Sequence, residues 1–139
     1  MALDGKVVVI TGAARGMGRA YVEGFLEKGS KVVALDRSWR PTGLSGDKDD
    51  TFSNSLDNRE DVLKMNFDIS DDEQIQDALD TTVKKFGTVD VLINNASLRQ
   101  LDLYAPTGFA KILDTTHEDF VRMFDVSFFG TVKVTRAFM

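Results

Sequence analysis

Apolar residues occur along this chain in short runs that are separated by amphipathic stretches. The runs predict buried strands at 6–10, 31–35, 62–67 and 89–94. Between most of them, apolar positions recur at the spacing of one helix face. This alternation predicts a parallel sheet with helices on both faces, joined by right-handed crossovers.

Three helices are predicted from start and stop signals. One runs from Arg19 to Lys28 and ends at Gly29. The second begins at the capping-box sequence Ser70-Asp71-Asp72-Glu73 and ends at Gly87. Its apolar face consists of Ile75, Ala78, Leu79, Val83 and Phe86. The third spans 117–139 after a cap at Thr116, and its many apolar residues need covering on several faces, by the sheet and by a partner subunit or a further segment of the chain.

Residues 37–61 form a polar interval with no sustained helical period, which predicts a long loop insertion at the surface. A calcium loop is the alternative, because Asp47 and Asp49 have the spacing of a first and third ligand. Phe52 and Asn58 argue against it, since they stand where such a loop needs glycine and a bidentate glutamate.

The segment Thr11-Gly12-Ala13-Ala14-Arg15-Gly16-Met17-Gly18 joins the first strand directly to the first helix. At such a junction free backbone N–H groups and the positive end of the helix dipole point at one place, which suits a pyrophosphate. Gly12 fits a tight turn, Gly16 a close backbone approach to phosphate, and Gly18 close packing of helix on strand. The alternative is a glycine-rich turn that only connects two elements.

Composition narrows the class of protein. With 139 residues, 42% hydrophobic and 28% charged, the chain fits one globular domain. A net charge of −5 argues against nucleic acid or an anionic membrane as partner. The lack of cysteine excludes disulfides and thiolate chemistry, and the first apolar run is too short for a signal peptide or membrane span, so a cytoplasmic protein is expected.

The glycine spacing T-G-x-x-x-G-x-G resembles that of the short-chain dehydrogenase/reductase family. Asp36, Asp68-Ile69 and Asn94-Asn95-Ala96 close the second, third and fourth apolar runs in the family's order. The resemblance implies a Rossmann-type doubly wound parallel α/β sheet, incomplete with four strands. Residues 1–139 would be the N-terminal part of the NAD-binding domain, with the remainder of the catalytic domain absent.

The resemblance also implies a cofactor site, made of Gly12, Arg15, Gly16, Met17, Gly18, Asp36, Arg37, Asp68, Ile69, Asn95, Ala96 and Ser97. Asp36 can accept hydrogen bonds from both hydroxyls of an adenosine ribose, which favours NAD over NADP. Arg15 and Arg37 favour a 2′-phosphate, but exposed pairing is weak and Asp36 decides. Alternatively, Asp36 is a solvated turn residue and Asp68 merely ends a strand. Ser97 replaces the family's glycine.

Catalytic residues are the missing part of the resemblance. The family uses a serine and a Tyr-x-x-x-Lys pair, but Tyr21 and Tyr104 are followed four residues on by phenylalanine and glycine. Ser127 stands where the family has a catalytic asparagine and is the one candidate. The only histidine, His117, is interpreted as part of a solvated helix start, so neither a Ser-His-Asp triad nor a histidine metal cluster is available.

Three hypotheses follow. The first is an NAD-dependent enzyme that transfers hydride between NAD and a small-molecule secondary alcohol or ketone, of which this chain supplies the inactive cofactor half, with 98–112 forming one wall of the substrate pocket. The second is a non-catalytic NAD-binding module, favoured by Ser97 and Ser127. The third is an interaction fragment whose last helix is covered by another chain. A homo-oligomer through the 117–139 helix is expected in the enzyme.

Overall fold

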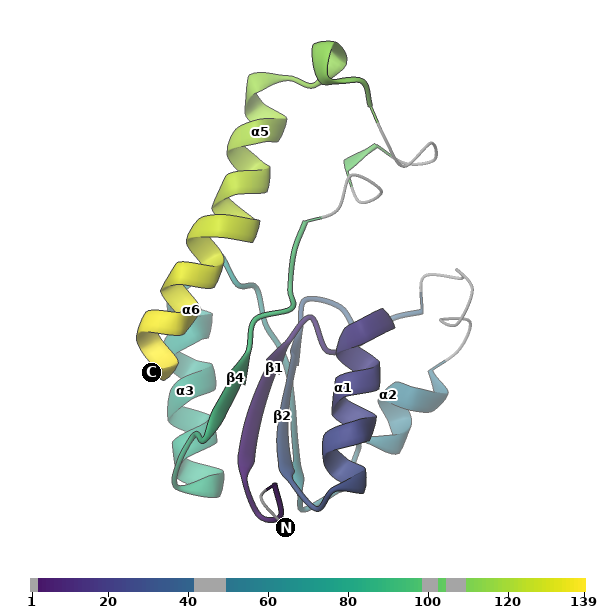
Figure 1. Ribbon diagram of the computed structural model, residues 1–139, viewed down its shortest axis with the longest axis vertical. Coiled ribbons are helices and arrows are strands. Elements are labelled where there is room, and N and C mark those ends of the chain that lie inside the picture. Colours follow the sequence, from purple (N-terminus) through teal and green to yellow (C-terminus); the bar gives the residue numbers. More distant parts are fainter. Residues whose placement is uncertain (1–2, 42–49, 99–102, 105–109) are drawn as a thin grey trace.

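The computed structural model describes residues 3–41, 50–98, 103–104 and 110–139. The calcium-loop candidates and most of the 98–112 wall lie outside these residues. The sheet has four parallel strands in the order β3-β2-β1-β4 (Figure 1): β1 (Val7–Thr11), β2 (Lys31–Asp36), β3 (Val62–Asn66) and β4 (Val91–Ile93). The predicted doubly wound sheet is therefore confirmed. After β3 the chain returns past β1 and forms β4 on the other side of it, so the strand order reverses between the neighbours β1 and β4. A crevice is expected at the carboxyl ends of these two strands.

Successive residues of the central strands point to opposite faces and build two separate cores. On β1, Val7 and Val9 enter one core while Val8 and Ile10 enter the other, and all are at most 1% exposed. A strand buried on both faces explains why the apolar runs in the sequence are continuous rather than alternating.

The helices divide between the two faces as expected (Figure 1). Helices α1 (Gly16–Glu27) and α2 (Thr51–Ser55) cover one face, and α3 (Asp72–Phe86) and α6 (Thr131–Phe138) cover the other. Helix α1 begins at Gly16 rather than Arg19, since the last residues of the glycine loop already form its first turn.

The prediction of a loop throughout 37–61 is wrong for residues 51–55, which form α2. This one-turn helix contains serine and asparagine, which are weak helix formers. Its stability comes from packing, because Phe52 and the adjoining Leu56 are buried in the core beside α1. Lys64 also donates from Nζ to the carbonyl oxygen of Ser53, at 3.0 Å.

The N-terminal cap of α3 is Asp71, and the predicted capping role of Ser70 is wrong. The Asp71 carboxylate accepts from the backbone N–H groups of Glu73 and Gln74. These bonds hold the pKa of Asp71 below its usual value, with the Gln74 N–H contributing most. The Ser70 hydroxyl instead donates to Asp68, at 2.6 Å. Gly87 ends the helix in the left-handed conformation, which confirms the predicted stop.

The C-terminal part of the chain forms a long helical arm that rises above the carboxyl ends of the strands (Figure 1). It consists of α5 (His117–Phe124), a π-helical turn η2 (Asp125–Gly130) and α6, and it follows a short 3-10 helix η1 (Ile112–Asp114). Thr116 caps α5 in a capping box with Asp119, which confirms the predicted start. Gly130 lets the arm pack against Ile69, whose carbonyl oxygen would lie 2.9 Å from a Cβ at that position.

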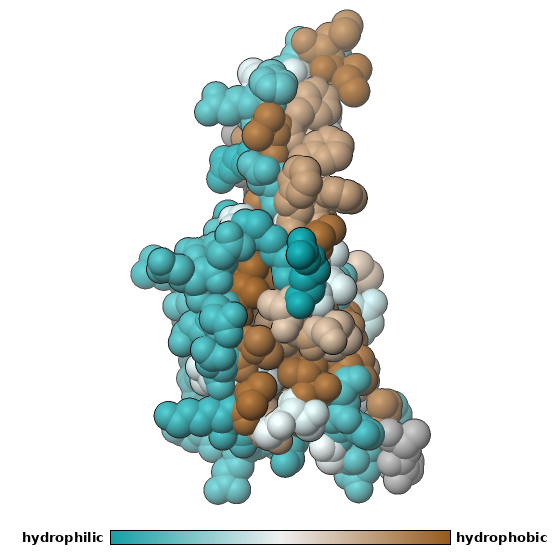
Figure 2. Space-filling model, turned by 90° about the vertical axis from the view of Figure 1, so that its left-hand side faces the viewer, coloured by the Kyte–Doolittle hydropathy of each residue, from teal (hydrophilic) through white to brown (hydrophobic). Residues whose placement is uncertain are grey.

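The arm carries an apolar ridge, which we define as Val121, Phe124, Phe128, Phe129 and Val132. Each of these side chains is between 39% and 58% exposed. The three phenylalanine rings pack edge to face, with centroids 6.4 and 5.2 Å apart. Figure 2 shows apolar side chains running along the arm toward the sheet. Among the described residues, no helix has both the length and the apolar character that crossing a membrane requires.

Candidate cofactor-binding site

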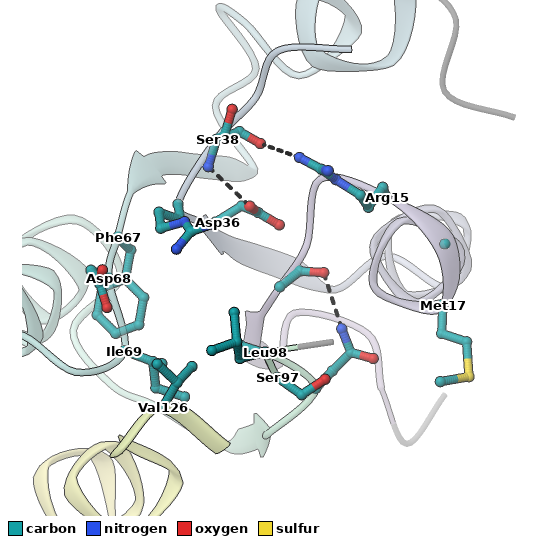
Figure 3. A pocket seen from close by; sticks show the side chains of 15 residues that line it. Arg15, Met17, Asp36, Ser38, Phe67, Asp68, Ile69, Ser97, Leu98 and Val126 are labelled. Carbon is teal, nitrogen blue, oxygen red and sulfur yellow. Dashed lines mark hydrogen bonds between the residues drawn. The ribbon is translucent and has the colours of Figure 1, made fainter. Parts of the chain in front are cut away.

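A cleft of about 330 Å³ lies at the carboxyl ends of the strands, where the strand order reverses (Figure 3). Of the twelve predicted cofactor residues, all except Gly18 line it. The walls also include four residues that the sequence did not assign to the cofactor site, namely Ser38, Phe67, Leu98 and Val126.

The glycine loop turns sharply from β1 into α1. Gly12 and Gly16 have φ angles of +66° and +53°, a region that favours glycine. Gly18 is buried beneath the loop, where a Cβ would collide with the carbonyl oxygen of Gly12. Gly18 does not line the cleft. Its lack of a side chain lets α1 pack closely against the end of β1, which is the role that the glycine spacing predicted.

The hydroxyl of Thr11 joins the ends of β1 and β4. Its Oγ1 accepts from the backbone N–H groups of Asn95 and Ala96, each at 3.0 Å. The side-chain amide of Asn95 in turn donates to the carbonyl oxygens of Thr11 and Gly12, each at 3.0 Å. Thr11 is completely buried. These bonds fix the glycine loop and the Asn95–Ala96 segment relative to each other on two sides of the cleft.

Asp36 holds the rim of the cleft at the end of β2. Its Oδ2 accepts from the N–H of Ala14 at 2.9 Å, and its Oδ1 accepts from the N–H of Ser38 at 3.0 Å. Arg15 donates from Nη2 to the carbonyl oxygen of Ser38, so its guanidinium is tied to the same segment (Figure 3). Arg37, by contrast, is exposed.

An apolar slot forms where the ends of β3 and the arm face each other. Phe67 and Ile69 are 3% and 4% exposed, and Val126 of η2 lies beside Ile69 (Figure 3). Asp68 lies between the two buried residues, with its Oδ1 accepting from the N–H and hydroxyl of Ser70. The slot therefore combines apolar walls with one carboxylate, a combination that suits a planar heteroaromatic ring with an exocyclic amine.

Ser127, the candidate catalytic residue, does not line the cleft. Its Oγ accepts from the backbone N–H of Leu98, at 3.1 Å. Leu98 and Ser97 border the cleft from the segment that follows β4 (Figure 3). Ser127 is thus adjacent to the predicted site and contacts it through the Leu98 backbone.

Tyr104 is bound to the start of α5. Its hydroxyl donates to Asp119 Oδ2 at 2.8 Å. Burial, with a further contribution from Asp119, raises the pKa of Tyr104 above its usual value. A general base at neutral pH needs a lowered tyrosine pKa, so this environment disfavours Tyr104 in that role. Within the described residues, no group of three or more histidine, aspartate or glutamate side chains is placed to hold a metal ion.

The four additional cleft residues differ in whether the sequence could have predicted them. Ser38 and Phe67 adjoin strand-end acids, and Leu98 directly follows Ser97, so the same strand-end signal could have included them. Val126 had no such signal, because it comes from the distant arm and resembles any other apolar helix residue.

Comparison with known proteins defines the class. The family model described as short chain dehydrogenase matches residues 6–139, and the chain belongs to the short-chain dehydrogenase/reductase family. It is 44% identical to fluoren-9-ol dehydrogenase from Terrabacter sp. (strain DBF63), over 97% of this chain and 36% of that protein.

Solved structures agree with this assignment. A 3-ketoacyl-(acyl-carrier-protein) reductase from Brucella melitensis, complexed with NADH, is 30% identical with a TM-score of 0.75, over 96% of this chain and 49% of that one. A short chain dehydrogenase/reductase from Burkholderia phymatum, in complex with NAD, is 29% identical with a TM-score of 0.75, over 99% and 44%. The chain thus spans half or less of the length of these proteins.

Proposed function

We propose that this chain binds NAD in the cleft and forms the cofactor-binding half of an oxidoreductase that transfers hydride between NAD and a secondary alcohol or ketone. The observation that carries the proposal is the convergence of four separate segments on one cleft: the glycine loop, Asp36, Asp68-Ile69 and the Asn95–Ser97 segment. Binding of NAD and NADH by two structural neighbours supports the same cofactor class.

In this proposal each segment contacts a different part of the cofactor. The amides of the glycine loop and the N-terminus of α1 bind the pyrophosphate. Asp36 accepts from the adenosine ribose hydroxyls. The adenine lies in the slot between Ile69 and Val126, with its amino group toward Asp68. The nicotinamide end lies against Ala96 and Ser97.

The part of the cleft around Asp36, where the adenosine ribose is proposed to bind, favours NAD over NADP. A 2′-phosphate would replace a hydroxyl that donates to Asp36 and would bring two negative charges together. The lost charge-assisted hydrogen bond alone is worth about 1.5–3 kcal/mol. Arg15 is already bonded to the Ser38 carbonyl, which leaves Arg37 as the cation freer to attract the phosphate. We therefore propose at least a tenfold preference for NAD, since one decade corresponds to about 1.4 kcal/mol.

Hydride transfer to a carbonyl needs a proton donor at the oxygen. Tyr104 does not begin a Tyr-x-x-x-Lys sequence and its hydroxyl donates to Asp119, so this chain alone is proposed to bind NAD without turning over substrate. The test incubates the 139-residue chain with NAD and fluoren-9-ol, and with a panel of other secondary alcohols, while following NADH absorbance. Binding without NADH formation supports the proposal. Sustained NADH formation by the purified chain would contradict it.

A non-catalytic NAD-binding module is the second candidate. It is favoured by Ser127, whose Oγ is occupied by the Leu98 N–H and whose side chain lacks the amide of the family's asparagine. The reading frame beyond Met139 separates the two candidates. A serine followed by a Tyr-x-x-x-Lys sequence supports the enzyme, whereas a stop codon at that point supports the module.

The apolar ridge supports a homo-oligomer in which a second copy covers Val121, Phe124 and Phe128. Exposure of three adjacent phenylalanines to water is unfavourable, and a self-complementary apolar face is typical of symmetric dimers. Sedimentation velocity should show association of the wild-type chain and a monomer for F124S/F128S. A monomeric wild-type chain at high concentration would argue against this interface. A cytoplasmic location stays a prediction.

A further inference from the structure

A second hollow adjoins the cleft on the side of the arm. We call it the arginine groove and define it by Arg37, Arg122, Lys133 and Arg136, with Val126, Phe129 and Val132 as apolar lining and Asp68, Ser70 and Asp125 as further polar lining. Its volume is about 730 Å³, within the range of small-molecule sites. Arg37, Asp68 and Val126 border both this groove and the cofactor cleft.

The cations of the groove come from separate elements that the fold brings together. Arg37 follows β2, while Arg122 lies on α5 and Arg136 on α6. Along the helix the last two are separated by about four turns. An occupant that contacts both side chains must therefore carry anionic groups at more than one point.

The three guanidinium groups are uncommitted. In the described part of the chain, the side chains of Arg37, Arg122 and Arg136 make no hydrogen bond or ion pair, and the one nearby acid that Arg122 affects is Asp119, whose pKa it helps to lower. Lys133 differs, because its Nζ bonds to Asp72 and to the carbonyl oxygen of Ser70, each at 3.1 Å.

The two carboxylates that line the groove, Asp68 and Asp125, do not pair with its arginine side chains. The side chain of Asp125 makes no hydrogen bond or ion pair within the described residues, and Asp68 already accepts twice from Ser70. Three guanidinium groups thus share a groove with two carboxylates and retain their N–H donors, in a chain whose net charge is −5. Guanidinium groups bind phosphate oxygens through paired N–H donors, which makes phosphate the matching anion.

We propose that the arginine groove binds a small molecule carrying an oligophosphate, next to the nucleotide cleft. Its phosphates would contact Arg37, Arg122 and Arg136, and its less polar part would lie against Phe129 and Val132. The small-molecule class is favoured over an acidic peptide because the groove shares its wall with the cofactor cleft and has the volume of a ligand site.

The test titrates inorganic tripolyphosphate into the full 139-residue chain by calorimetry at low, constant ionic strength. R122Q/R136Q should weaken binding at least tenfold. The matched control is K28Q/K84Q, which removes the same charge from exposed lysines outside the groove and should change the dissociation constant by less than twofold. R37Q removes the third guanidinium group of the groove and should also weaken tripolyphosphate binding. Thermal melts show whether each variant is folded.

Four results would overturn the proposal. Equal weakening in R122Q/R136Q and K28Q/K84Q would mean non-specific charge attraction. No weakening in R122Q/R136Q or R37Q would mean that tripolyphosphate binds elsewhere, for example at the glycine loop. No detectable binding of tripolyphosphate to the wild-type chain would show that the groove does not bind oligophosphates. Tighter binding of hexaglutamate than of tripolyphosphate would assign the groove to an acidic peptide instead.

Discussion

The α-carbon of Gly18 lies so close to the carbonyl oxygen of Gly12 that no side chain fits between them. This contact joins the first turn of α1 to the end of β1, and the Asn95 side-chain amide donates to the same oxygen. The glycine loop is thus held by packing and hydrogen bonds before any ligand binds. We expect its amides to be preorganised for a phosphate.

Replacement of Gly18 by alanine should therefore displace α1 and lower both the melting temperature and the affinity for NAD. The matched control is G24A in the same helix, where a Cβ would meet nothing within 4 Å. Alanine is a better helix former than glycine by about 1 kcal/mol, so G24A should be neutral or stabilising. Thermal melts of both variants test this, and equal effects of the two substitutions would contradict it.

The Thr11 hydroxyl should contribute to stability through the bonds that it accepts. T11V keeps the shape of the side chain but leaves the N–H groups of Asn95 and Ala96 without an acceptor, at a cost of about 1–3 kcal/mol. T11S keeps the hydroxyl and loses one methyl group, at about 0.8 kcal/mol. Urea unfolding should rank wild type above T11S and T11S above T11V. A T11V chain as stable as T11S would show that the hydroxyl is unimportant.

Asp36 should set the cofactor preference. D36N removes the charge that favours ribose hydroxyls and disfavours a 2′-phosphate, so it should weaken NAD binding and narrow the gap between NAD and NADP. Both dissociation constants are measured by calorimetry. D50N serves as a charge-matched control, because Asp50 is exposed and lies outside the cleft. An unchanged ratio of the two constants in D36N would assign the preference to other residues.

The Asp71 cap should make stability depend on pH in the acidic range. Its pKa is lowered in the folded chain by the N–H groups that it accepts from. A lowered pKa stabilises the fold above the unfolded value, near 4, and that contribution is lost as pH falls through the folded pKa. The difference in melting temperature between wild type and D71A should thus be largest near neutral pH and shrink below about pH 4. D77A, which removes an exposed aspartate of the same helix, provides the control.

The sequence predicted those features that depend on local pattern. The strands follow from continuous apolar runs, and the cleft residues at the strand ends were implied by motifs that resemble those of the short-chain dehydrogenase/reductase family. Helix α2 was missed because Phe52 and Leu56 stabilise it through contacts with distant strands rather than through a periodic pattern. Val126 was missed for a related reason, since only the packing of the arm over Ile69 brings it to the cleft.

The N-terminal cap of α3 was also not decided by the sequence. Ser70 and Asp71 are both good capping residues, and the sequence does not say which one precedes the first helical residue. The structure gives the position to Asp71 because Asp68 takes the Ser70 hydroxyl. The side chain of Asp68, two residues before Ser70, thus decided which residue caps the helix.

The central claim is that the cleft binds NAD through Asp36. Its most direct test is parallel calorimetric titration of NAD and NADP into the wild-type 139-residue chain at the same ionic strength. We expect NAD to bind with a dissociation constant at least ten times lower than that of NADP. Equal dissociation constants, tighter binding of NADP, or no heat of binding with either cofactor would contradict it.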